Sequence, residues 1–74
     1  MGEGTQTELA GTVARITYTN QENHYTVLRL HTPDGEVTAV GTFPSVAVGA
    51  ELRLLGEWYM HPVYGRQFNT QSYS

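Results

Sequence analysis

The stretch LAGTVARITY, residues 9–18, changes the face on which its apolar side chains lie. Leu9 and Val13 occupy odd positions, whereas Ile16 and Tyr18 occupy even ones. Because successive side chains of a strand point to opposite faces, this change predicts a β-bulge, an extra residue within one long strand. Such a strand bends, and it can then serve two sides of a small barrel.

The rest of the chain also predicts strands rather than helices. Clusters of Gly, Pro, Asn and Asp separate segments rich in Val, Thr and aromatic residues, a spacing typical of a small sandwich or barrel. Within one segment, Leu52, Leu54 and Trp58 share a face. We therefore expect five strands, at residues 9–18, 25–32, 36–43, 51–59 and 66–73.

This pattern predicts an all-β fold, a small five-stranded OB-type barrel. It has at most one helical turn, for which the linker at residues 44–50 leaves room. Gly11, Gly41 and Gly56 lie inside strand patterns, where glycine often marks a bend or the close approach of another backbone.

The pattern also sets the expected limits of the domain and its core. We expect residues 1–7 to form a disordered N-terminal segment, and residues 8–74 to form the barrel, as a fragment of a larger protein. A domain this small has a thin core that needs its largest side chains. We therefore expect Phe43, Trp58 and Phe68 to lie in the core.

Composition excludes several classes of function. The chain has 74 residues, a net charge of −3 and no cysteine, and all four of its basic residues are arginine. Without lysine it cannot contain a P-loop, and without cysteine it has neither disulfides nor thiolate metal sites. The lack of a basic excess disfavours tight non-specific binding of nucleic acid. No apolar run reaches membrane-spanning length, so we expect a cytoplasmic protein without a membrane partner.

The remaining ionisable residues form no recognisable catalytic pattern. The spacing of His24, His31 and His61 matches no short metal-ligand motif. Asp34 lies in a Pro-Asp-Gly turn, where its side chain bonds nearby backbone. We therefore expect no catalytic, metal-binding or cofactor-binding residue in this chain.

Aromatic and arginine side chains near two turns are the candidate binding residues. Tyr18 and Tyr25 flank the first turn, Arg29 shares the face of Tyr25, and Tyr64 and Arg66 flank the last turn. In an OB barrel, oligonucleotides lie across the second and third strands, between the loops that follow the first and fourth. These residues are expected at that place, where they could stack on bases and supply charge. Alternatively, the tyrosines cap the barrel rim with their hydroxyls in water.

Several motifs, taken in order, resemble the N-terminal domain of RecD-like ATP-dependent DNA helicases, in the long form with an extra N-terminal region. They are GTVARITY at 11–18, NQENHYTVL at 20–28, VGTFP at 40–44, GEW at 56–58 and HPVYGRQF at 61–68. The resemblance covers about residues 9–73.

One position departs from the usual pattern of that family, which has glycine where this chain has His24. Glycine suits a positive φ, and Asn and His tolerate it better than most residues. We therefore expect the turn to be shifted by one residue, with Asn23 taking the positive φ.

The resemblance implies that the parent protein is an exodeoxyribonuclease V alpha-chain-like hydrolase that binds ATP and Mg²⁺ in motor domains outside this chain. It would unwind DNA in the 5′ to 3′ direction during repair or recombination. The chain itself would be a non-catalytic accessory domain that contacts single-stranded DNA weakly. Alternatively, it is a protein-interaction or scaffold barrel that docks on the motor domains or a partner protein. The helicase context favours DNA, whereas the negative charge favours docking.

Overall fold

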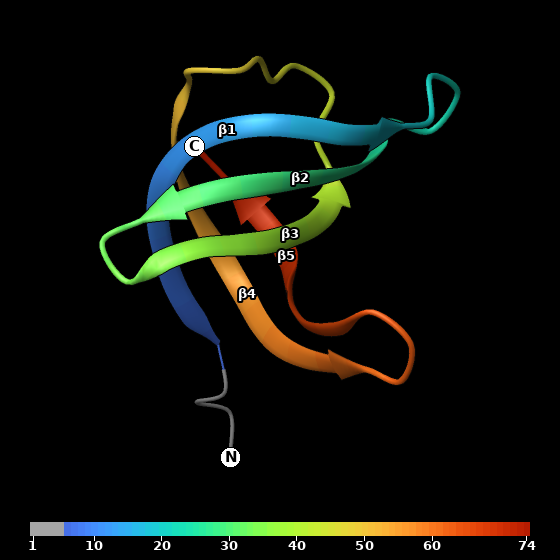
Figure 1. The fold of residues 1–74 in the computed structure, drawn as a ribbon. Coiled ribbons are helices and arrows are strands. Elements are labelled where there is room, and N and C mark those ends of the chain that lie inside the picture. Colours follow the sequence, from blue (N-terminus) through green and yellow to red (C-terminus); the bar gives the residue numbers. More distant parts are fainter. Residues whose placement is uncertain (1–5) are drawn as a thin grey trace.

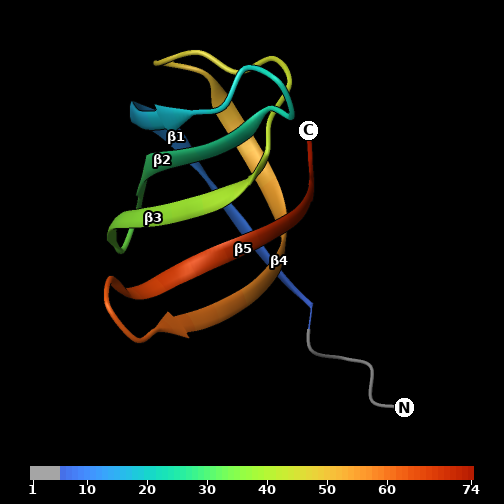
Figure 2. The ribbon, with the colours of Figure 1, turned by 90° about the vertical axis from the view of Figure 1, so that its right-hand side faces the viewer.

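The computed structural model describes residues 6–74, which form five strands and no helix. The strands are β1 (Thr7–Thr19), β2 (Tyr25–Thr32), β3 (Gly35–Thr42), β4 (Glu51–His61) and β5 (Gly65–Tyr73). They close into a barrel in the order β1-β2-β3-β5-β4, which can be followed from top to bottom in Figure 2. The expected all-β, OB-type barrel is confirmed, and each strand matches its expected range to within two residues at either end.

The segments outside the strands are short. The linker at residues 43–50 contains bends and a turn but no helical turn. Residues 1–5, most of the segment expected to be disordered, lie outside the described residues, and β1 begins at Thr7. The described part of the chain holds no helix that could cross a membrane.

Strand β1 takes part in two ladders. Its first half pairs with β4 and its second half with β2, and Thr12 belongs to both. The register shifts between Val13 and Arg15 and again between Ile16 and Tyr18, which confirms the bulge expected from the sequence. The strand consequently curves round the barrel, as Figure 1 shows, and joins its two sides.

Glycines allow the strands to approach one another closely. A Cβ on Gly11 would clash with the carbonyl oxygen of His31, and one on Gly56 would clash with that of Asn69. At Gly41 the added Cβ would lie 3.0 Å from its neighbours on β5. The close backbone approach expected at these glycines is therefore confirmed.

The barrel interior is filled by apolar side chains from all of these strands. The buried core consists of Val13, Leu28, Leu30, Ala39, Phe43, Leu52, Leu54 and Phe68. Trp58 is only partly buried and packs edge-on against Phe68, with 5.1 Å between the ring centroids. The sequence-based assignment to the core is confirmed for both phenylalanines, whereas Trp58 lies at the edge of the core.

The turn between β1 and β2 differs from the expectation at one residue. His24 itself has the positive φ, 64°, so the expected shift of the turn to Asn23 is wrong. Asn23 instead forms an Asx-type turn, in which its Oδ1 accepts a hydrogen bond from the backbone N–H of Tyr25 at 2.9 Å. The carbonyl of His24 accepts a hydrogen bond from the backbone N–H of Phe43 at 3.0 Å, which ties the turn to the end of β3.

We expect Gly56→Ala to lower the free energy of unfolding by about 3 kcal/mol, because the new methyl group would push β5 away. Gly35→Ala is the control, since the space around Gly35 is open and only its φ of +119° carries a cost, about 1 kcal/mol. Urea denaturation of both variants measures these costs. A loss at Gly56 no larger than that at Gly35 would show that β4 and β5 do not pack this closely.

We expect His24→Gly to raise the free energy of unfolding by about 0.5 kcal/mol, since glycine takes a positive φ without a Cβ clash. The exposed His24 side chain contributes no packing that would be lost. His31→Gly, within β2, should instead destabilise the chain. Thermal unfolding followed by circular dichroism checks both, and equal losses in the two variants would contradict the proposed strain at His24.

Candidate functional site

A groove of about 560 Å³ crosses the outer face of β2 and β3. Tyr18 and Tyr25, at the two ends of the β1–β2 loop, line it on one side, and His61 and Tyr64 of the β4–β5 hairpin line it on the other. The two loops project from the same side of the barrel, the right-hand side in Figure 1. The groove therefore lies where an OB barrel binds oligonucleotides.

The floor of the groove comes from three strands: Val27 and Arg29 on β2, Thr38 and Val40 on β3, and Gln67 on β5. Val40 is 6% exposed and Gln67 is 9% exposed, although neither belongs to the connected cluster of apolar side chains that fills the barrel. The outer face thus has a small buried layer of its own beneath the groove. This layer gives a flat ligand a surface to pack on.

The β1–β2 loop is held by its asparagine side chains. Oδ1 of Asn20 accepts hydrogen bonds from the backbone N–H groups of Glu22 at 2.8 Å and Asn23 at 3.3 Å. Asn23 in turn accepts from the backbone of Tyr25. These local bonds stabilise the turn without any packing, and they fix the backbone from which the Tyr25 ring projects.

The β4–β5 loop is held by a histidine. Nδ1 of His61 accepts hydrogen bonds from the backbone N–H groups of Val63 at 3.0 Å and Tyr64 at 3.1 Å. The His61 ring also lies 4.7 Å from the ring of Tyr64, centroid to centroid. Tyr64 is 79% exposed, so this contact and the loop itself are what orient it.

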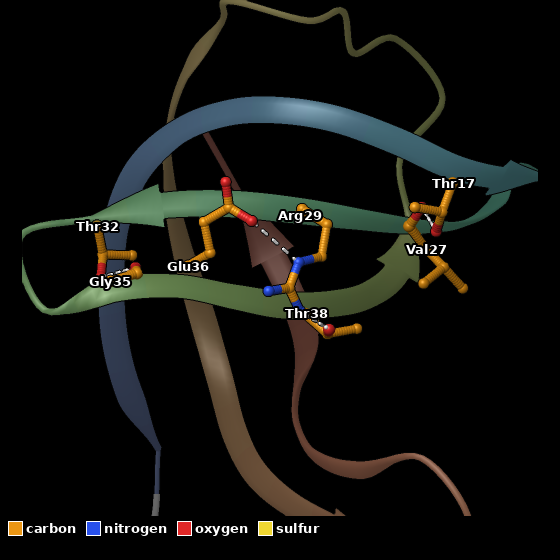
Figure 3. A network of polar contacts seen from close by, with 7 residues as sticks. All are labelled: Thr17, Val27, Arg29, Thr32, Gly35, Glu36 and Thr38. Carbon is orange, nitrogen blue, oxygen red and sulfur yellow. Dashed lines mark hydrogen bonds and ion pairs between the residues drawn. The ribbon is translucent and has the colours of Figure 1, made fainter.

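Arg29 is already engaged by two neighbours on β3. Its Nε lies 3.3 Å from Oε1 of Glu36, and a terminal nitrogen donates to Oγ1 of Thr38 at 2.6 Å. Figure 3 shows the guanidinium lying across β3 between these two side chains. Because the pair is about a third exposed, it contributes little to stability. Its effect is to hold the guanidinium in place and to set a carboxylate of opposite charge beside it.

The structure brings four of the five candidate residues together, namely Tyr18, Tyr25, Arg29 and Tyr64. Arg66 is not among the residues that line the groove. Its guanidinium carbon lies 3.8 Å from the centroid of the Trp58 ring, a cation–π contact at the edge of the core.

Sequence reasoning missed the remaining residues of the groove, which are Thr17, Val27, Thr38, Val40, His61 and Gln67. For Gln67 a signal was present, since alternation places it opposite the buried Phe68. For Thr38 and Val40 the needed information was the register that sets them beside Arg29 and Val27.

The second depression on the surface and the histidines are weaker candidates for a binding site. A depression of about 610 Å³ between β1, β2 and β4 is lined by no tyrosine, tryptophan or phenylalanine among the described residues. His24 lies in the first turn and His31 is exposed on β2, apart from His61. Across residues 6–74, no group of three or more His, Asp or Glu side chains could hold a metal ion.

The sequence model of a known domain family, described as the OB-fold domain of ATP-dependent DNA helicase YrrC, matches residues 6–74. The match confirms the resemblance to RecD-like helicases that the sequence motifs indicate. No curated protein matches the chain.

Proposed function

This chain belongs to the family of OB-fold domains of the ATP-dependent DNA helicase YrrC, and we propose that it is a non-catalytic accessory domain that holds single-stranded DNA weakly. The observation that carries the proposal is the groove over β2 and β3, lined by Tyr18, Tyr25, Arg29 and Tyr64. These residues come from the two loops and the sheet face that bind oligonucleotides in OB barrels.

Ring stacking supplies most of the proposed affinity. Tyr18 and Tyr25 are 52% and 41% exposed, and Tyr64 is more exposed still, so a large part of each side chain is open to a ligand. Stacking of one base on an aromatic ring contributes about 1–3 kcal/mol and depends little on sequence. Val27 and Val40 add an apolar surface beneath the rings.

Charge supplies little of the affinity, which is why the proposed contact is weak. Arg29 is the one arginine among the described residues lining the groove, and Glu36 offsets its charge. The chain carries a net charge of −3 and no lysine that could track a phosphate backbone. Few counterions would be released on binding, so affinity should depend only modestly on salt.

The proposal extends to the parent protein. In it, motor domains outside this chain would use ATP and Mg²⁺ to unwind DNA in the 5′ to 3′ direction, in repair or recombination in the cytoplasm. The barrel would contact those motor domains and keep an unwound strand close to them. Family membership supports this extension.

A second candidate function is docking to the motor domains or to a partner protein. The observation in its favour is the β4–β5 hairpin, where Met60 and Val63 are 67% and 76% exposed and lie outside the groove. Exposed apolar side chains grouped in this way are typical of protein contacts.

We expect the double variant Tyr25→Ala, Tyr64→Ala to weaken binding of a short oligo-dT at low salt by at least about tenfold, because two stacking surfaces are lost. Tyr59→Ala is the matched control, since Tyr59 is 45% exposed but does not line the groove. An NMR titration measures the affinities and should show shifts at the groove residues. Equal affinity of the double variant and the unaltered chain would favour docking instead.

We expect Glu36→Gln to strengthen binding of oligo-dT by about two- to fivefold at low salt, because the charge of Arg29 is then no longer offset. Glu8→Gln is the control: Glu8 lies 3.1 Å from Arg53 in a similar exposed ion pair, away from the groove. Fluorescence anisotropy at several salt concentrations measures both. If the two variants behave alike, Arg29 does not face the DNA.

A further inference from the structure

The Gln67 side chain combines deep burial with an unused amide. It is 9% exposed and forms part of the groove floor on β5. None of the side-chain hydrogen bonds found among residues 6–74 involves its amide, and the amide atoms keep some access to solvent, since the buried side-chain polar atom without a partner in these residues is Oγ1 of Thr70. An apolar side chain of similar length would fill the same place without leaving an amide that lacks a partner in the protein. The fold therefore does not need an amide at this position.

The polar side chains near Gln67 already have hydrogen-bond partners, so Gln67 is the side chain at the floor of the groove that can bond to a ligand. Arg29 is engaged by Glu36 and Thr38, and Nδ1 of His61 already accepts two backbone N–H groups. Val40, 6% exposed, offers an apolar contact beside the amide. A flat ring that lies on this floor would meet apolar surface with its face and an amide with its edge.

We propose that Gln67 reads the hydrogen-bonding edge of one unpaired base in the groove, an inference that rests on the proposed binding of single-stranded DNA. A glutamine amide offers an N–H donor beside a carbonyl acceptor. Thymine offers the complementary pair, since its N3–H donates to Oε1 while a ring carbonyl accepts from Nε2. Recognition of unstacked bases on this edge is common for single strands.

The contact has a consequence that stacking alone does not have. In a duplex the same edge is occupied by the partner base, so Gln67 can engage a base only in a single strand. Stacking on tyrosine, by contrast, requires only a ring face, which every base provides. Gln67 would therefore let the groove distinguish an unpaired base from a base that is paired in a duplex.

The test compares two single-stranded probes of equal length, oligo-dT and the same oligonucleotide made with N3-methylthymine, which lacks the N3–H donor. We expect the unaltered chain to bind oligo-dT about three- to tenfold more tightly, as for one neutral hydrogen bond at a buried site. Gln67→Leu should bind the two probes equally. Gln71→Leu, at an exposed glutamine of the same strand, should keep the preference.

Fluorescence anisotropy at low salt gives the affinities, and thermal unfolding shows whether each variant is folded. Gln67→Met, which also keeps the length of the side chain, provides a second test if Gln67→Leu does not fold. Equal binding of the two probes by the unaltered chain, or an unchanged preference in the Gln67 variants, overturns the inference. If binding still depends on Tyr25 and Tyr64, the proposed function survives that result. Failure of the unaltered chain to bind either probe overturns both.

Discussion

The barrel depends on one strand that hydrogen-bonds to two neighbours, since β1 pairs with β4 through its first half and with β2 through its second. The two register shifts turn the strand between these ladders, and the bare backbone of Gly11 lets the neighbouring strand come close. This bend also positions the groove. It carries the end of β1 to the side of the barrel from which the β4–β5 hairpin projects (Figure 1). Tyrosines of both loops consequently line the same groove.

The groove has aromatic sides and nearly balanced charge, because the carboxylate of Glu36 lies beside the guanidinium of Arg29. An anion that approached Arg29 would compete with this carboxylate, whereas a ring that stacked on Tyr25 or Tyr64 would compete with no ion pair. The arrangement therefore favours ligands with flat faces over ligands with concentrated charge. The proposed weak and reversible hold on a strand would suit the proposed role beside a motor that moves DNA.

Much of the fold could be predicted from the sequence because alternation and turn residues are local signals. The phase change between Val13 and Ile16 indicated the bulge, and it is present. The groove was harder, because strand register decides which side chains meet, and register is a non-local property. Arg66 shows this limit: its place beside Tyr64 in sequence suggested the groove, yet its guanidinium lies over Trp58. At His24, an Asx turn at Asn23 determined the backbone where residue preference alone did not.

The position of β5 has a consequence for how the chain is made. This strand, the last of the five described, lies between β3 and β4, and it joins β3 through the parallel pairs Ala39–Phe68 and Val40–Asn69. Until it is in place, both neighbours present unpaired edges and the core lacks Phe68. During synthesis the ribosome must therefore release residues 65–73 before the barrel can close, and an earlier intermediate would expose edges open to association with other chains.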